Sequence, residues 1–437
     1  MDLATALITG YFGSLNGELL IGGVPVSALA DRYQTPLFIY DSHVLDRKWD
    51  LLCRTLPPQF VISYSVKANP NVSILKHFVT SGCGLEIASG GEFQLAMSAG
   101  CPPHNVLFAG PGKTESELEL VLAHQIGEIH AESLLEIERL AAISRRLGVQ
   151  AKVAVRVNPS GEAQGGAMRM GGKPAPFGVD EENMDDVLSR ILAEPSLEFR
   201  GIHLFTGTQI LDCNILVRQY GKALEIARRT ACRIRRPLDT VDFGGGLGVP
   251  YFAGENELDM DKFRDALVDL MDGVEGDPLF AGTQFIVEPG RYLVAEAGIY
   301  VTRVNDVKVS RGRKFVIVDG GMNHHLAASG NLGQVFKRNF PLAVLNKLRE
   351  KRTEVVDVVG PLCTPLDVLA REARLPAADV GDLVGIFQSG AYARTASPLG
   401  FLSHPSPAEV LVHNGDVRLI RRRGTYGDWL SDMPTSN

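Results

Sequence analysis

Lys67 is the first residue whose type and position suggest chemistry. It stands in Tyr64-Ser65-Val66-Lys67-Ala68-Asn69-Pro70, directly after an apolar run. If that run is a buried strand, the lysine lies where the strand emerges, and desolvation there lowers the pKa of an amine toward nucleophilic use. An ordinary surface lysine explains the position equally well, so the residue alone leaves both interpretations open.

A glycine cluster and an arginine follow two later apolar runs. The cluster is Gly244, Gly245 and Gly246, where backbone without side chains can approach a ligand and its N–H groups can form an anion nest. Arg291 ends Val287-Glu288-Pro289-Gly290-Arg291 and supplies a guanidinium, which binds phosphate through paired hydrogen bonds. Tight turns also need glycine, so the glycine cluster alone is weak evidence for a phosphate site. Together with Arg291, the cluster indicates such a site.

Glu288 adds a carboxylate beside this phosphate site. On its own it would be interpreted as a solvated or ion-paired residue. A lysine that captures an aldehyde, a phosphate cradle and a carboxylate that holds a pyridinium proton are together the groups that pyridoxal phosphate needs. No other common cofactor needs all three, so the sequence predicts a pyridoxal-phosphate site.

Eight short apolar runs, each but the last followed by an amphipathic stretch, position these residues. Strands that alternate with helices form a parallel sheet, and eight units over about 230 residues match the size of a (β/α)8 barrel. Such barrels collect their functional residues at the C-terminal ends of the strands. The predicted strands are 60–66, 85–88, 106–109, 128–131, 153–157, 199–205, 241–243 and 285–287.

Beyond residue 298 the pattern changes to alternating runs separated by turn residues, which predicts a mainly antiparallel β domain. Its expected strands are 300–309, 315–319, 355–359, 383–387 and 410–412. The segment before Thr35 is too small to fold alone, and we expect its runs 19–21 and 24–26 to add a strand to this β domain. The predicted domains are an N-terminal segment over 1–34, a barrel over 35–297 and a β domain over 298–437.

The amino-acid composition limits which classes of binding partner are expected. The 437 residues include 44 Lys and Arg against 51 Asp and Glu, and the net charge of −7 disfavours nucleic acid or an anionic membrane as the main partner. No apolar run approaches the ~18 residues of a membrane span and the N-terminus lacks a basic region, so we expect a cytoplasmic protein. The six cysteines show no CxxC spacing, which predicts free thiols and no metal site.

The motifs resemble those of the fold-type III pyridoxal-phosphate decarboxylases, which include diaminopimelate, ornithine and arginine decarboxylases. The resemblance covers nearly the whole chain, and that family has a barrel followed by a β domain. The matching motifs, in family order, are Tyr64-Ser65-Val66-Lys67-Ala68-Asn69, Ser89-Gly90-Gly91-Glu92, Gly244-Gly245-Gly246, Glu288-Pro289-Gly290-Arg291-Tyr292, Gly360-Pro361-Leu362-Cys363 and Gly390-Ala391-Tyr392.

This resemblance implies roles for individual residues. Lys67 would bind the cofactor aldehyde, Glu288 would pair with the pyridine nitrogen, and Phe205 falls at the position that stacks on the ring. The remaining cofactor-binding residues would be Thr208, Gly244, Gly245, Gly246, Gly290, Arg291 and Tyr392. The family works as a head-to-tail homodimer with active sites at the interface. Cys363 and Asp367 match family residues that one subunit contributes to the active site of its partner.

Two departures from the family pattern bear on the substrate. Diaminopimelate decarboxylases carry His-Cys-His-Ile-Gly-Ser-Gln where this chain has His203-Leu204-Phe205-Thr206-Gly207-Thr208-Gln209. A phenylalanine can pack on a ring but offers no proton, so acid–base roles fall to His203, Lys67 or Cys363. In addition, the family's acidic residue that receives a distal amine is replaced by Thr364, and losing a buried charge partner is commonly worth several kcal/mol.

A narrower branch is similar at the same points. Its motifs are Met168-Arg169-Met170-Gly171-Gly172-Lys173-Pro174, Phe177-Gly178, Gly248-Val249-Pro250-Tyr251-Phe252 and Leu326-Ala327-Ala328-Ser329-Gly330-Asn331. This branch comprises secondary-metabolism decarboxylases, including a butirosin-pathway enzyme for glutamate attached to an acyl carrier protein, siderophore enzymes and an exosortase-associated group. The resemblance implies a modified or carrier-linked amino acid as substrate.

The expected reaction is decarboxylation at Cα, with Cys363 of the neighbouring subunit as first candidate for returning the proton and Lys67 as second. Two alternatives remain: a diaminopimelate decarboxylase of lysine biosynthesis, and a racemase or pyridoxal-phosphate-binding protein.

Two arginine clusters are candidate docking surfaces for an acidic carrier protein. One is the stretch with Arg228, Arg229, Arg233, Arg235 and Arg236, and the other is Arg421 to Arg423. His324 and His325 are expected on opposite faces of a strand, which argues against a shared metal.

Overall fold

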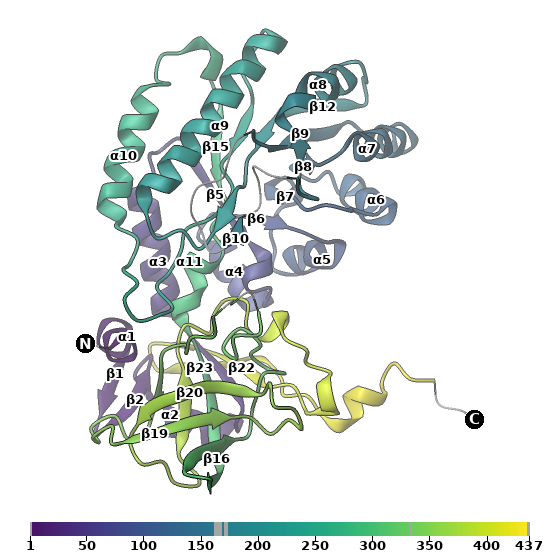
Figure 1. The fold of residues 1–437 in the computed structure, drawn as a ribbon. Coiled ribbons are helices and arrows are strands. Elements are labelled where there is room, and N and C mark those ends of the chain that lie inside the picture. The colour runs from purple at the N-terminus through teal and green to yellow at the C-terminus, as the bar shows by residue number, and fades with distance from the viewer. Residues whose placement is uncertain (1, 161–167, 170–173, 333, 335, 435–437) are drawn as a thin grey trace. The chain divides into compact units, whose positions relative to one another are not determined.

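The structure is a computed structural model that describes residues 2–160, 168–169, 174–332, 334 and 336–434. The chain forms two compact units (Figure 1). The barrel unit comprises residues 50–249 and 256–290, and the β unit comprises residues 1–49, 250–255 and 291–437. Residues 170–173, which belong to one of the branch motifs, lie outside the described residues.

Eight parallel strands form the barrel, and they coincide with the eight predicted runs. Each pairs in parallel with its neighbours, and pairing of β15 with β5 and of β8 with β9 closes the ring. The predicted parallel barrel is therefore confirmed. The strands are β5 (Phe60–Ser65), β6 (Gly84–Ile87), β7 (Val106–Phe108), β8 (Glu128–Ala131), β9 (Ala151–Asn158), β12 (Leu197–His203), β14 (Thr240–Asp242) and β15 (Gln284–Val287).

Helices follow the barrel strands and lie around the outside of the ring (Figure 1). They are α4 (Val72–Thr80), α5 (Gly90–Ser98), α6 (Glu115–Ala123), α7 (Leu134–Leu147), α8 (Met184–Leu192), α9 (Cys213–Ile234) and α10 (Met260–Asp272). All except α8 begin at a side chain that accepts a backbone N–H, as Ser89 does from Glu92 in α5. These caps define where each strand-to-helix loop ends.

Short elements complete the barrel unit. Strand β11 (Val179–Asp180) adds to β9, and β10 (Met168–Arg169) pairs with β13 (Gly207–Thr208). Single 3-10 turns are η1 (Val66–Ala68), η2 (Pro103–Asn105), η3 (Glu181–Asn183) and η4 (Pro278–Phe280). Helix α3 (Ser42–Thr55) runs from the β unit into the barrel unit. Among the described helices, none combines the length and the apolar character needed to span a bilayer.

The β unit is built on a mixed, mainly antiparallel sheet in the order β20-β19-β17-β16-β4-β22-β23, to which β21 and β18 are added. Among the strands described in this unit, the β17–β19 and β4–β22 pairs are parallel and the other pairs of the sheet are antiparallel. Each of the five predicted runs overlaps a strand, so the predicted β domain is confirmed as a fold. The strands are β4 (Leu37–Asp41), β16 (Gly298–Ser310), β17 (Arg313–Val318), β18 (Leu342–Val344), β19 (Glu354–Val359), β20 (Val368–Leu375), β21 (Leu383–Ile386), β22 (Ala408–His413) and β23 (Asp416–Arg421). Its short helices are α11 (Arg291–Val294), η5 (Ala295–Ala297), η6 (Arg394–Ala396), η7 (Phe401–Ser403) and η8 (Tyr426–Leu430).

The N-terminal segment belongs to the β unit in a different way from the one predicted. After α1 (Leu3–Tyr11), β1 (Gly13–Leu15), β2 (Glu18–Ile21) and β3 (Val24–Pro25) form a three-stranded sheet of their own, followed by α2 (Val26–Tyr33). The turn at Gly22 and Gly23, both at positive φ, folds β3 back onto β2. Side chains of these elements share one core with the large sheet.

Strand β4 is the segment that extends the large sheet. It pairs with β16 on one side and with β22 on the other. Residues 35–49 therefore group with the β unit and not with the barrel, which was expected to begin at residue 35. The reason is that partners of β4 lie more than 250 residues away in sequence, and a local pattern does not encode such pairing. The division into domains at residues 34 and 297 stays a prediction.

His324 and His325 lie in a turn and not in the expected strand. Both imidazoles are buried and hydrogen-bonded: His324 contacts the hydroxyl of Tyr300 at 3.1 Å, and Nδ1 of His325 accepts the N–H of Ala328 at 3.3 Å. Nε2 of His325 lies 2.9 Å from Oγ of Ser389. Burial lowers the pKa of each imidazole to about 3.

These two histidines predict acid sensitivity of folding. A histidine with a folded-state pKa near 3 and an unfolded-state pKa near 6.5 stabilises the fold above pH ~6.5, and the stabilisation is lost as the pH falls toward 3. At pH 5 each should destabilise the protein by about 2 kcal/mol relative to pH 7. Melting curves of the wild type and of His325→Gln should show a smaller loss of melting temperature between pH 7 and 5 in the variant. Equal losses would contradict this account.

Candidate active site

Lys67 lies at the C-terminal end of β5, in the 3-10 turn η1, as the sequence predicts. Its Nζ is 3.0 Å and 3.1 Å from the two carboxylate oxygens of Glu86 on β6, and Glu86 also accepts the hydroxyl of Ser65 at 2.5 Å. The lysine side chain is 42% exposed and the Glu86 side chain 1% exposed. The lysine side chain is therefore only partly removed from water, and the buried carboxylate of Glu86 orients its amine.

The turn that carries Lys67 packs against the turn after β15. The N–H of Ser65 donates to the carbonyl oxygen of Pro289 at 3.1 Å. A Cβ at Gly290 would lie 3.0 Å from Cβ of Ala68 and 3.2 Å from Cβ of Ser65. Gly290 thus permits a close approach that fixes the lysine turn beside the Glu288 turn.

The glycine turn after β14 has the geometry of an anion cradle. Gly244 and Gly246 have φ of +66° and +103°, and a Cβ at Gly245 would overlap the carbonyl oxygen of Glu288. The N–H of Glu288 donates to the carbonyl oxygen of Gly244 at 2.8 Å. Only glycine satisfies all three positions, so the turn presents bare backbone at the same barrel end as Lys67 and Glu288. Thr208, predicted to bind the cofactor, lies half-buried on β13 and Gly207 touches Gly246.

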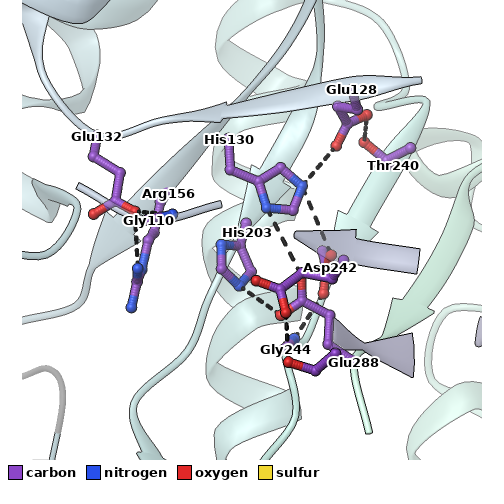
Figure 2. A network of polar contacts seen from close by, with 12 residues as sticks. Gly110, Glu128, His130, Glu132, Arg156, His203, Thr240, Asp242, Gly244 and Glu288 are labelled. Carbon is purple, nitrogen blue, oxygen red and sulfur yellow. Dashed lines mark hydrogen bonds and ion pairs between the residues drawn. The ribbon is translucent and has the colours of Figure 1, made fainter. Parts of the chain in front are cut away.

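Glu288 sits in a buried cluster of ionisable side chains (Figure 2). Its Oε2 is 3.4 Å from Nε2 of His203, and its Oε1 is 3.9 Å from Nδ1 of His130. Nε2 of His130 lies 3.2 Å from Glu128 and 3.7 Å from Asp242. Ligand-type atoms of His130, His203, Asp242 and Glu288 all lie within 4.8 Å of one another. Two carboxylates and two imidazoles therefore share one dry site.

The surroundings shift the pKa values of the two carboxylates, Asp242 and Glu288, in opposite directions. Burial and the charge of Glu288 raise the pKa of Asp242 well above its ordinary value. Burial alone would raise the pKa of Glu288, but the imidazoles of His203 and His130 and the ammonium of Lys67 lower it below its ordinary value. Burial lowers the pKa of His203 to about 4. The pKa of Asp242 is thus shifted up and that of Glu288 down, which favours the ionised form at Glu288, and His203 is neutral at pH 7.

Unsatisfied atoms in this cluster match a ring nitrogen. Oε1 of Glu288 and both ring nitrogens of His203 are buried and have no hydrogen-bond partner. Buried polar atoms without partners are rare, so they indicate a missing donor, and the protonated pyridine nitrogen of pyridoxal phosphate supplies one to an ionised Glu288. The residues present therefore fit this cofactor. The same donor types also bind zinc, so the expected lack of a metal stays a prediction.

In the β unit, Arg291 and Tyr392 form the predicted pair. Nη1 of Arg291 donates to the hydroxyl of Tyr251 at 3.1 Å, and its guanidinium carbon lies 4.6 Å from the ring centroid of Tyr392. Its Nε is buried without a hydrogen-bond partner. Arg291 is half-buried and has no carboxylate at ion-pair distance among the described residues, so its guanidinium is suited to an anion such as a phosphate.

The predicted substrate residues lie on one loop of the β unit. Cys363 is exposed and Thr364 is half-buried. Asp367 is 3% exposed, and its two oxygens accept the N–H groups of Met322 at 2.6 Å and Leu362 at 2.9 Å. Asp367 thus holds the loop in shape within its own chain, and its expected contact with a substrate in the partner subunit stays a prediction.

Phe205 follows β12 and is half-buried in the barrel unit, beside the glycine turn: a Cβ on Gly244 would lie 2.9 Å from its Cδ2. The guanidinium carbon of Arg156 on β9 is 6.0 Å from the ring centroid of Phe205, and its Nη1 donates to Glu132 at 2.8 Å (Figure 2). The phenylalanine therefore lies next to the cradle, where the stacking residue was expected.

Sequence reasoning missed Glu86, His130 and Asp242. Each is a polar residue within or at the end of an apolar strand, and each is buried. That pattern was the available signal, because a charged residue inside a buried strand requires a partner. Glu86 contacts the amine of Lys67, and His130 lies close to both Asp242 and Glu288.

A lysine, a glycine cradle and an ionised carboxylate at the C-terminal end of a parallel barrel define a pyridoxal-phosphate enzyme of the barrel type. The family "Pyridoxal-dependent decarboxylase, pyridoxal binding domain" matches residues 43–295, and the chain belongs to this family. It is an enzyme with pyridoxal phosphate as cofactor, and its family activity is decarboxylation.

Individual relatives cover nearly all of the chain. The L-glutamyl-[BtrI acyl-carrier protein] decarboxylase of Niallia circulans is 39% identical over 407 residues, covering 92% of this chain and 94% of that protein. The diaminopimelate decarboxylase of Aquifex aeolicus is 33% identical over 420 residues, covering 95% and 96%. A crystal structure of diaminopimelate decarboxylase from M. jannaschii in complex with L-lysine superimposes with a TM-score of 0.89 at 26% identity, covering 98% of each chain.

The carboxylate pair generates a prediction. Glu288→Gln should lower kcat on the order of 100-fold or more, because an amide cannot keep the proton on the pyridine nitrogen. Asp242→Asn is the matched control: the asparagine resembles the protonated acid and its Oδ1 can still accept the N–H of Gly244, now bonded at 2.7 Å. Steady-state kinetics should therefore show a much smaller loss for Asp242→Asn. Equal losses would contradict the assignment of the ionised carboxylate to Glu288.

Proposed function

We propose that this decarboxylase acts on an amino acid whose side chain ends in a neutral, tethered group, with glutamate carried on an acyl carrier protein as the substrate. The observation that carries the proposal is the loop that matches the family's substrate loop. Its exposed or half-buried residues are Cys363, Thr364, Pro365 and Leu366, and none bears a charge. Asp367, the next residue, is buried and accepts the backbone N–H groups of Met322 and Leu362.

The chemistry of the tether agrees with that loop. Decarboxylation at Cα needs a free α-amine to reach the cofactor and a free α-carboxylate to leave. A carrier-linked glutamate must therefore be attached through its side-chain carboxyl group, as a thioester. The far end of this substrate is neutral, whereas ornithine ends in an ammonium and diaminopimelate in an ammonium beside a carboxylate, and a buried ammonium needs an acidic partner. Support also comes from the relative that acts on L-glutamyl carrier protein.

The residues of this chain have separate tasks. Lys67 would hold the cofactor through its aldehyde, the glycine turn with Gly290, Arg291 and Tyr392 would hold its phosphate, and Glu288 would accept the hydrogen bond of its pyridine nitrogen. When bound, pyridoxal phosphate supplies the electron sink that accepts the bonding electrons of the departing carboxylate. Phe205 would pack against the cofactor ring and exclude water from it.

The proton that replaces the carboxylate requires a donor near Cα. His203, expected as a possible acid, is neutral at pH 7 because burial lowers its pKa to about 4, which leaves it to orient Glu288. The exposed thiol of Cys363 is the proposed donor, delivered across the interface of a homodimer, with Lys67 as the alternative. The dimer is part of the proposal, because Cys363 and Thr364 would act in the partner's site.

A second candidate is decarboxylation of free diaminopimelate. It is favoured by the diaminopimelate decarboxylases of Aquifex aeolicus and Methanothermobacter thermautotrophicus, each 33% identical to this chain. The neutral side chain of Thr364 argues against it. A racemase is the remaining alternative from the sequence, and membership of the decarboxylase family argues against it.

The test is release of carbon dioxide from matched substrates. We expect turnover of γ-glutamyl thioester on carrier protein, and a kcat/KM at least 100-fold lower for free glutamate and free diaminopimelate, because the neutral loop offers no charge to either free side chain. Thr364→Glu should raise kcat/KM for diaminopimelate relative to the wild type. Preferred turnover of diaminopimelate by the wild type would contradict the proposal, and deuterium at Cα without carbon dioxide would indicate a racemase.

A further inference from the structure

The β unit contains a pocket that the proposed chemistry does not use. Its volume is about 670 Å³, and it is lined by residues of the 250–255 loop, β17, β20 and the loop before β18. Four lining side chains are cations, Arg313, Lys337, Arg338 and Arg371, against one acid, Glu372. In a protein with a net charge of −7 this concentration of positive charge is local.

Two of the four cations are not neutralised. Arg338 lies 3.1 Å from Glu255, and Arg313 is paired with Asp357. Within the described part of the chain, neither Lys337 nor Arg371 has a carboxylate at ion-pair distance; Lys337 donates to the amide oxygen of Asn331 at 2.6 Å. The pocket therefore keeps a surplus of positive charge that an anion would compensate.

Backbone contacts hold the cations in place. Asn339 accepts the N–H of Arg371 at 2.9 Å and donates to the carbonyl oxygen of Arg371 at 2.6 Å, which clamps the loop before β18 to β20. The next residue, Glu372, has φ of +47°, and its N–H donates to Asp357 at 2.8 Å. These hydrogen bonds fix the backbone on both sides of the pocket, so the cationic side chains extend from a defined frame.

An aromatic wall joins the pocket to the arginine assigned to the cofactor phosphate. The guanidinium carbon of Arg338 lies 3.7 Å from the ring centroid of Phe252. The rings of Phe252 and Tyr251 both pack on Phe340, with centroids 6.0 Å and 4.7 Å away. The hydroxyl of Tyr251 accepts a hydrogen bond from Arg291. The pocket is thus one layer of side chains from a residue of the site itself.

We propose that this pocket binds the phosphodiester of the phosphopantetheine arm through which a carrier protein presents its substrate. The inference rests on the proposed function, because only a carrier-linked substrate brings this group. The arm has one phosphodiester at the protein end and the thioester at the other. Guanidinium groups bind such an anion through paired hydrogen bonds, and Phe252 offers an apolar surface to the chain that follows.

The other candidate docking surface carries less weight. On α9, Arg228 is paired with Asp277, Arg229 lies 2.8 Å from Glu181 and Arg233 lies 3.6 Å from Asp185. Arg235 and Arg236 lie beyond the helix end at Ile234 and not along the helix as expected. Four of these five guanidiniums, all but that of Arg235, already have a carboxylate at ion-pair distance, whereas Lys337 and Arg371 have none among the described residues.

The test compares two soluble substrates on the holoenzyme: γ-glutamyl-phosphopantetheine and γ-glutamyl-pantetheine, which lacks the phosphate. For the double variant Lys337→Gln/Arg371→Gln we expect KM for the phosphopantetheine thioester to rise on the order of 10- to 100-fold, with kcat unchanged. KM for the pantetheine thioester should stay within about twofold. Lys76→Gln/Arg418→Gln, which removes two exposed cations outside the pocket lining, is the matched control and should change neither value.

Calorimetry of phosphopantetheine binding separates this inference from the proposed function. If the wild type decarboxylates neither thioester, the proposed function fails, yet binding of phosphopantetheine that is lost in Lys337→Gln/Arg371→Gln would still support the pocket. An equal KM in variant and wild type, or an equal rise for both thioesters, would overturn the inference. Binding of inorganic phosphate as tightly as phosphopantetheine would also overturn it, because the pocket would then be a simple phosphate site.

Discussion

Closure of the parallel barrel is the constraint on which the site depends. Because β15 pairs with β5 and β8 pairs with β9, the C-terminal ends of all eight strands meet at one rim. Lys67 follows β5, the glycine turn follows β14 and Glu288 follows β15, so residues more than 200 positions apart become neighbours. The contact between Ser65 and Pro289 then fixes two of these turns against each other.

The candidate site also depends on a cluster of ionisable side chains buried in the barrel interior. An isolated ionised carboxylate in the barrel interior would be strongly destabilising, and proteins avoid this by pairing or by neutralising the group. Here the surroundings shift the two carboxylates in opposite directions: His203 and His130 lower the pKa of Glu288, and burial beside Glu288 raises the pKa of Asp242. The arrangement prepares a negative charge where a pyridinium ring needs it, before any cofactor binds.

Much of this could be predicted from sequence, for local reasons. The barrel strands are short apolar runs bounded by turn residues, and the glycine turn, Lys67 and Glu288 stand directly after such runs. The pairing of β4 with β16 and β22 could not be predicted, because these partners are distant in sequence. Glu86 and His130 lie inside strands, and only packing shows that they face other ionisable groups. The hydrogen bonds of Asp367 to Met322 and Leu362 could not be predicted, because they depend on a turn geometry that the sequence does not specify.

The central claim is that the amine of Lys67, oriented by Glu86, is the single group that captures the cofactor aldehyde. The most direct measurement is borohydride reduction of the yellow holoenzyme followed by peptide mapping. We predict one pyridoxyl group per chain, located on Lys67, and no fixed cofactor in Lys67→Ala. Label on another lysine, or an unlabelled wild type that still decarboxylates its substrate, would contradict the account.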